Sequence, residues 1–200
     1  LNKILKLKNL EQIFKNKIFF DIFKLVFPEF KYMERTKNFS IIRNLKLKIL
    51  DRNNILALLL VDSSNNHEYF CHKYKVSNET RDYLDFCGKN FKEVQKNKNF
   101  FKKDLKKNIF FHKKNKIKSL FFIYSLAKTN FKPKDLMSMF SKIDDMYIPK
   151  FPITGKYLLE KGIKSGKKMG MAIKEIEKKW IDNNFSLNND ELNKLINQFK

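Results

Sequence analysis

Glycine is distributed so unevenly along this chain that it limits where the backbone can turn sharply. Four of the five glycines lie between Gly155 and Gly170, within the segment 151–170, and the rest of the 200-residue chain holds one. Glycine adopts positive φ angles without strain and lets two backbones approach closely. We therefore expect an unusual local structure in residues 151–170 and regular secondary structure elsewhere.

The pattern of apolar residues is helical along almost the whole chain. Apolar residues recur at three- and four-residue steps, and no segment alternates with the two-residue period of a strand. This pattern predicts an all-α fold class, an irregular multi-helix bundle of roughly ten helices. The expected helices outside the glycine-rich segment span 9–17, 18–27, 39–50, 55–61, 67–75, 77–91, 92–118, 120–128 and 133–145.

Several residues indicate where these helices begin or end. Pro28 ends the helix before it, because a proline ring clashes with the preceding turn. Pro133 opens a helix at a position where its missing N–H does no harm. Ser77 is a typical cap for the helix that follows it, and 51–54 reads as a turn between helices.

A change of composition near residue 148 predicts two parts. Ile148-Pro-Lys-Phe-Pro152 should be extended, since each proline pushes the residue before it out of the α region. We expect residues 1–147 to form one helical region. Residues 148–200 should form a C-terminal region built on a helix, a glycine turn and a second helix.

Local signals place the ends of these two C-terminal helices. Thr154 is expected to cap a short helix over 155–161, and Gly162 to end that helix in the left-handed conformation. Ser165 is expected to cap the second helix, which reaches Trp180.

The start of the second helix combines glycine with positive charge. Gly166 and Gly170 share a helix face, where small residues let two helices, or a helix and a ligand, approach closely. Lys164, Lys167 and Lys168 crowd the positive end of the helix dipole, and a bound phosphate would offset their cost. A plainer interpretation gives the glycines to helix packing and the lysines to solvent. The candidate RNA-binding residues are Lys150, Thr154, Gly155, Lys156, Lys164, Ser165, Gly166, Lys167 and Lys168, with Tyr147, Phe151 and Tyr157 as candidates for stacking on bases.

The net charge of +22 favours a polyanionic partner, either nucleic acid or an anionic membrane. Of the 43 basic residues, 39 are lysine, which gives affinity for phosphates without reading bases. Heavy use of Lys, Asn, Ile and Phe is also typical of an AT-rich genome, so part of this charge needs no partner.

Cysteine and apolar content point to a cytoplasmic setting. Cys71 and Cys87 are the only cysteines, too few for a disulfide framework. The longest apolar run, Ile55–Val61, is too short to span a bilayer, and we expect no membrane partner. His67 and His72 lie close to the cysteines in sequence, but the spacing matches no standard zinc pattern.

The segment 151–180 carries a set of residues that matches one known family. The set comprises Phe151-Pro-Ile-Thr-Gly155, Leu158, Gly162-Ile163, Gly166, Met169-Gly170, Ile176-Glu177 and Trp180, with weaker matches at Phe27-Pro28-Glu29, Val76-Ser77-Asn78-Glu79 and Asn189–Leu192. It resembles the C-terminal part of the CCA-adding tRNA nucleotidyltransferases, which are related to bacterial poly(A) polymerases. Tyr157 departs from the pattern, since the family usually has aspartate there.

The resemblance implies a division of labour. In that family a catalytic head binds Mg²⁺ with CTP or ATP, a neck selects the nucleotide, and a helical body and tail hold tRNA. This chain resembles the late neck, body and tail. It has no Asp-x-Asp pair, and Asp144-Asp145 are adjacent, so their side chains do not face one direction on a helix. The head is expected upstream of Leu1 or on another chain, no cofactor is expected here, and the chain alone should bind tRNA without catalysis.

Three alternatives stay open at the level of sequence. A poly(A)-adding relative would share the same body. A non-enzymatic helical module would bind RNA or DNA through the same glycine turn. A membrane-surface or structural protein would use basic amphipathic helices on anionic lipid.

Overall fold

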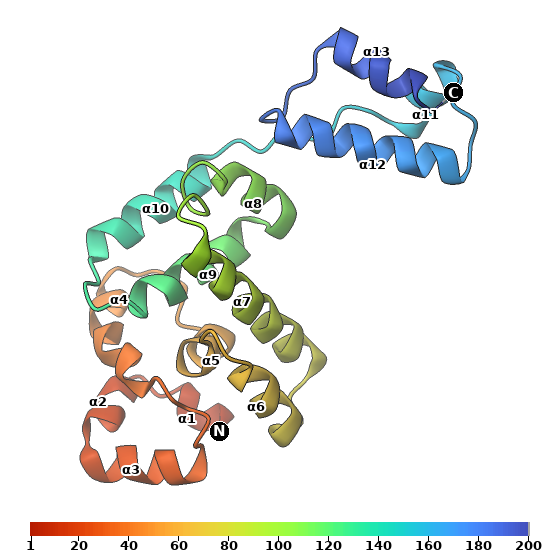
Figure 1. The fold of residues 1–200 in the computed structure, drawn as a ribbon. Coiled ribbons are helices and arrows are strands. Elements are labelled where there is room, and N and C mark those ends of the chain that lie inside the picture. Colours follow the sequence, from red (N-terminus) through yellow and green to blue (C-terminus); the bar gives the residue numbers. More distant parts are fainter. Residues whose placement is uncertain (200) are drawn as a thin grey trace. The chain divides into compact units, whose positions relative to one another are not determined.

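The structure, a computed structural model, describes residues 1–199. Over these residues the chain forms thirteen α-helices and one 3₁₀ helix and no strand, which confirms the all-α prediction (Figure 1). The chain divides into two compact units, Leu1–Met146 and Tyr147–Lys200. This division falls one residue before the boundary expected from composition.

The first unit is arranged around one helix that is buried on all sides. The helices of this unit are α1 (Asn2–Leu5), α2 (Leu10–Lys15), α3 (Lys17–Val26), η1 (Met33–Asn38), α4 (Phe39–Asn44), α5 (Arg52–Leu60), α6 (Asn66–Tyr74), α7 (Asn78–Lys96), α8 (Leu105–His112), α9 (Lys114–Leu126) and α10 (Pro133–Asp145). Every residue of α5 from Asn54 to Leu60 is buried, and α5 packs against α1, η1, α6, α7 and α9. The expected core helix over 55–61 is therefore confirmed.

The start of α5 lies where the sequence had predicted a turn. Asp51 is the N-cap, and its carboxylate accepts hydrogen bonds from the backbone N–H of Asn54 at 2.9 Å and from the Asn54 amide at 2.6 Å. The expectation of a turn over 51–54 is wrong, because a side-chain cap lets polar residues begin a helix. The hydroxyl of Tyr83 in α7 donates a hydrogen bond to the side-chain oxygen of Asn54, which links the two helices.

A buried arginine completes the other end of α5. The Arg35 guanidinium donates to the carbonyl oxygens of Leu58 at 3.1 Å and Val61 at 2.7 Å. It also stacks on the Tyr32 ring, 3.6 Å from the centroid. Burial lowers the pKa of Arg35. The last carbonyls of a helix have no intrahelical partners, so Arg35 satisfies groups that would otherwise be buried without hydrogen bonds.

Two long expected helices are interrupted in the structure. The helix expected over 39–50 ends at Asn44, and Lys46 has a φ of 53°. The helix expected over 92–118 is divided into the end of α7, the turns of 97–104, α8, and α9 after Lys113 at a φ of 69°. Asn97 accepts a hydrogen bond from the backbone N–H of Asn99 at 2.9 Å. Asparagine side chains compete in this way with helical hydrogen bonds, and the periodic apolar residues did not reveal it.

The single glycine of the first unit accommodates a buried histidine. A Cβ added at Gly88 in α7 would lie 2.2 Å from the Cε1 of His67 in α6. His67 is 2 % exposed, and its Nδ1 has no hydrogen-bond partner among the described residues, while Nε2 lies 3.8 Å from a carboxylate oxygen of Asp85. Burial lowers the pKa of His67, against the opposing effect of Asp85. Gly88 is thus a packing requirement between α6 and α7.

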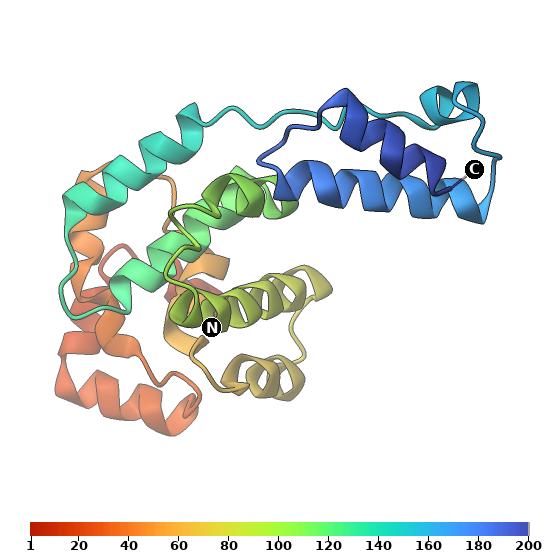
Figure 2. The same cartoon turned by 45° about the horizontal axis from the view of Figure 1, so that its top comes forward.

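The second unit consists of three helices around a small core. They are α11 (Gly155–Glu160), α12 (Lys167–Asp182) and α13 (Asn189–Asn197). The core comprises Leu158, Ile163, Ala172, Ile176, Leu192 and Ile196. Figure 2 shows α13 beside α12, and the two are in contact. The helix α13 was not predicted, although Asn188 caps it by accepting from the N–H of Glu191 at 2.7 Å.

Substitution of Gly88 by alanine should strongly destabilise the first unit. The new methyl group would overlap the His67 ring, which is buried, so we expect a loss of about 1–3 kcal/mol or more. Chemical unfolding followed by circular dichroism measures this loss.

The matched control is Gly170→Ala in α12, where an added Cβ meets no atom within 4 Å. Alanine should there stabilise the second unit by about 0.5–1 kcal/mol, since glycine is a poor residue for a helix interior. The fluorescence of Trp180, the only tryptophan, reports on that unit. Similar effects of the two substitutions would contradict the packing role of Gly88.

Candidate nucleic-acid interface

The helix α11 has the expected cap at each end. The Thr154 hydroxyl accepts a hydrogen bond from the N–H of Tyr157 at 3.2 Å. At the other end, the N–H of Gly162 donates to Leu159 at 2.9 Å and the N–H of Ile163 donates to Leu158 at 3.0 Å. This pair of hydrogen bonds is a Schellman motif, and Gly162 has the positive φ, 91°, that the motif requires. The predicted left-handed glycine is confirmed.

The helix α12 begins differently from the prediction. Gly166, with φ 112° and ψ −153°, is the N-cap, and no side chain within residues 1–199 caps the first turn. The expectation that Ser165 caps α12 is wrong, because the turn at Gly166 starts the helix one residue later and leaves Ser165 exposed before it. The first turn of α12 therefore presents backbone N–H groups without a side-chain partner, at the positive end of the helix dipole.

The segment before α11 runs antiparallel to α12. The ring of Phe151 lies 5.3 Å from that of Trp180, near the end of α12, and a Cβ on Gly155 would lie 3.3 Å from the Met169 sulfur, near its start. Lys150 therefore lies beside the end of α12, about 20 Å from the first turn at 1.5 Å per residue. The structure separates Lys150 from the other candidate residues.

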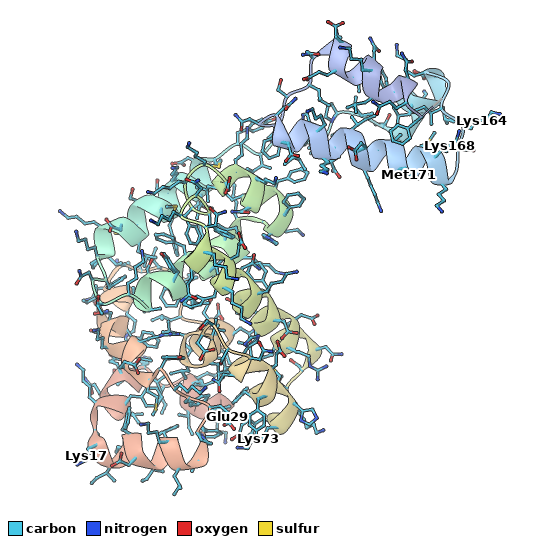
Figure 3. The ribbon with its side chains drawn as sticks, viewed as in Figure 1. Lys17, Glu29, Lys73, Lys164, Lys168 and Met171 are labelled. Atoms are coloured by element: carbon cyan, nitrogen blue, oxygen red, sulfur yellow. The ribbon has the colours of Figure 1, made fainter. Side chains whose placement is uncertain are left out.

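The remaining candidate lysines are exposed, and most lie around the start of α12. Lys156, Lys164, Lys167 and Lys168 are all exposed, and none forms an ion pair within the described residues. Figure 3 shows Lys164 and Lys168 at the same end of α12. The first turn of α12 contains no acidic residue. Cations at a helix N-terminus are unfavourable by themselves, and an anion bound there would offset that cost.

Two further lysines extend this positive surface along α12. Lys174 and Lys178 are exposed and follow Lys167 at steps of seven and four residues, so the three share one face. We call Lys167, Lys174 and Lys178 the basic stripe; it spans about 16 Å along the helix axis. Glu175 borders this face. Lys174 and Lys178 lie outside the predicted set, although their helical spacing from Lys167 is visible in the sequence.

Close packing between helices does not explain Gly166 and Gly170. A Cβ added at either residue would meet no atom within 4 Å. The positive φ of Gly166 accounts for that glycine, while Gly170 is exposed and is the fourth residue of α12. The expectation of close contact between helices is therefore wrong for Gly166 and Gly170, while close approach of a ligand there stays a prediction.

Two of the three aromatic candidates are partly buried, and the third is exposed. Phe151 and Tyr157 pack against the core of the second unit, whereas Tyr147 is 78 % exposed. At position 157, the tRNA nucleotidyltransferases that the segment resembles usually have an aspartate. Here a tyrosine contributes to packing at that position. Tyr147 is the aromatic candidate with a free face for stacking.

The described residues contain no cluster of side chains that could hold a metal ion. Residues 1–199 bring together no three His, Cys, Asp or Glu side chains that could hold a metal ion. Cys71 and Cys87 are buried free thiols, and burial raises the pKa of Cys71 to about 11 and that of Cys87 to about 12. Asp144 accepts from Lys118, and Asp145 from Ser141. No helix among the described residues has the length and apolar character needed to cross a membrane.

Comparison with family models found no match, and comparisons with curated proteins and with solved structures found none either. The resemblance to tRNA nucleotidyltransferases therefore rests on the motif residues themselves.

Replacement of Gly162 should show how far the α11–α12 turn depends on its left-handed residue. Gly162→Ala is expected to destabilise the second unit by about 1–2 kcal/mol, because alanine is strained at a φ of 91°. Gly162→Asn is the matched control and should lose less, since asparagine tolerates this conformation. Urea unfolding followed by Trp180 fluorescence distinguishes the two, and equal losses would argue against the backbone explanation.

Proposed function

We propose that this chain binds RNA through the start of α12 and the basic stripe. The observation that carries the proposal is the uncapped first turn of α12, with unpaired lysines around it. Free backbone N–H groups and lysine ammonium groups are both donors to phosphate oxygens.

The chemistry of these donors fits recognition of a phosphate backbone. A phosphate at the first turn of α12 would accept from the N–H groups there and lie near Lys164 and Lys168. The basic stripe would continue along the backbone, with Lys174 and Lys178 as further point charges. Lysine contacts of this kind give affinity and register but do not read base sequence. The exposed ring of Tyr147 is available for one unpaired base.

The RNA we propose is tRNA, and the reaction served is addition of CCA to its 3′ end. This part of the proposal is supported by the motif residues of segment 151–180 and their resemblance to the family described above. This chain would hold the tRNA, while a catalytic head, upstream or on another chain, would bind Mg²⁺ and CTP or ATP. A poly(A)-adding relative would hold its RNA in the same way, so the head decides between the two products.

The affinity for tRNA should depend on the lysines of α12. Replacing Lys164, Lys167 and Lys168 together by glutamine should weaken binding at low salt by about tenfold or more, and should reduce the salt slope by about 2–3. Fluorescence anisotropy with labelled tRNA over a series of salt concentrations measures both quantities.

The matched control removes the same charge elsewhere. Lys132, Lys134 and Lys142 are exposed lysines of the first unit, in or next to α10. Their replacement by glutamine should have a much smaller effect. Equal losses in the two triple variants would mean that total charge, and not the start of α12, determines binding.

The isolated chain is expected to bind tRNA without extending it. Incubation with Mg²⁺, CTP, ATP and a tRNA lacking its 3′ CCA should give no incorporation, because the carboxylates that position the metal ions belong to the head. Incorporation of nucleotides by the isolated chain would falsify this assignment of roles. Addition of a separately produced head that restores extension would support it.

A further inference from the structure

The helix α3 presents a continuous apolar face to solvent. Five of its ten residues are large apolar side chains that are exposed by about half or more: Ile18 by 71 %, Phe19 by 49 %, Ile22 by 49 %, Leu25 by 84 % and Val26 by 52 %. Their spacing of one, three, three and one residues places them on one side of a helix. We call these five residues the α3 face.

The helix α3 contributes little to the core of the first unit. Of its residues only Phe23 is buried, and its ring contacts those of Phe14 at 5.1 Å and Phe27 at 6.1 Å. The helix packs against α2, and Figure 1 shows it at the edge of the first unit. The α3 face is therefore not a core surface of that unit, and exposed apolar patches of this kind mark interaction sites.

The charges around α3 favour an anionic partner. Within residues 15–26 the ionisable side chains are Lys15, Lys17, Lys24 and Asp21, all exposed, which leaves an excess of positive charge. Figure 3 shows Lys17 at the outer end of α3. The nearby carboxylate Glu29 is buried and paired with Lys73 at 2.8 Å, so it does not offset this excess at the surface.

An amphipathic helix binds a bilayer surface through its apolar side chains and through the attraction of its cations to anionic headgroups, and the affinity rises with both contributions. The α3 face provides the apolar side chains, and Lys15, Lys17 and Lys24 provide the cations. An exposed apolar face with exposed lysines beside it therefore favours an anionic lipid surface as its partner.

We propose that α3 is an interfacial helix that docks this protein onto anionic lipid surfaces. The α3 face would lie between the acyl chains, and Lys15, Lys17 and Lys24 would lie among the lipid phosphates. The lack of an apolar run long enough to span a bilayer predicted no membrane partner, but binding at the surface, the alternative that basic amphipathic helices left open, requires no spanning helix. This inference is independent of RNA binding, since α3 and α12 belong to different units.

Binding to vesicles tests the proposal directly. The complete chain should co-sediment with vesicles of equimolar phosphatidylglycerol and phosphatidylcholine, and much less with phosphatidylcholine alone. The double variant Ile22→Ser with Leu25→Ser should bind the anionic vesicles at least about tenfold more weakly, since the lost side chains make the apolar contact with the lipid. It should keep its tRNA affinity and its circular dichroism, because both side chains are exposed.

The control is Met137→Ser in α10, an apolar residue of the same unit that is 48 % exposed, and it should bind vesicles as the parent does. A Phe19→Trp variant adds a reporter to the α3 face, and brominated lipid should quench it. Three results would overturn the proposal: equal vesicle binding by the α3 variant and the parent, a tryptophan at position 19 that is not quenched, or a dimer of the parent that the α3 variant dissociates.

Discussion

Burial of α5 from Asn54 to Leu60 is the constraint on which the first unit depends. A helix that is apolar on every side needs neighbours all round, and α1, η1, α6, α7 and α9 provide them. Burial also deprives the C-terminal end of this helix of water, so its last carbonyl groups need hydrogen-bonding partners from the protein. Arg35 donates hydrogen bonds to two of these carbonyl oxygens, while Asp51 caps the more exposed start. The position of η1, which carries Arg35, is therefore tied to the end of the core helix.

The second unit folds around a core of far fewer buried residues. Its core holds six buried residues, and its connections are fixed by backbone turns: Gly162 after α11, and Asn184 after α12, where the N–H of Phe185 donates to Trp180 at 2.8 Å. Because these turns place the chain without covering the start of α12, its N–H groups stay available. The lysines there are not required for packing, and this leaves them free to bind phosphate.

Two surfaces thus remain that folding does not explain. The basic stripe and the uncapped turn of α12 suit a phosphate backbone, whereas the α3 face suits an apolar layer with anionic groups above it. The net charge of +22 is compatible with both partners and by itself distinguishes neither. Only the placement of charge beside free N–H groups in one unit, and beside exposed apolar groups in the other, separates the two kinds of surface.

The sequence by itself determined the features that depend on neighbours along the chain. The helical class, the start of α10 at Pro133, the caps Ser77 and Thr154 and the left-handed Gly162 all follow from interactions within about four residues. Tertiary structure decided the contacts between distant residues: Arg35 with the end of α5, Gly88 against His67, and the distance of Lys150 from the start of α12. It also decided exposure. The apolar pattern of α3 predicts a helix with a buried face, but whether a neighbour covers that face depends on chain far away in sequence, which local periodicity does not record.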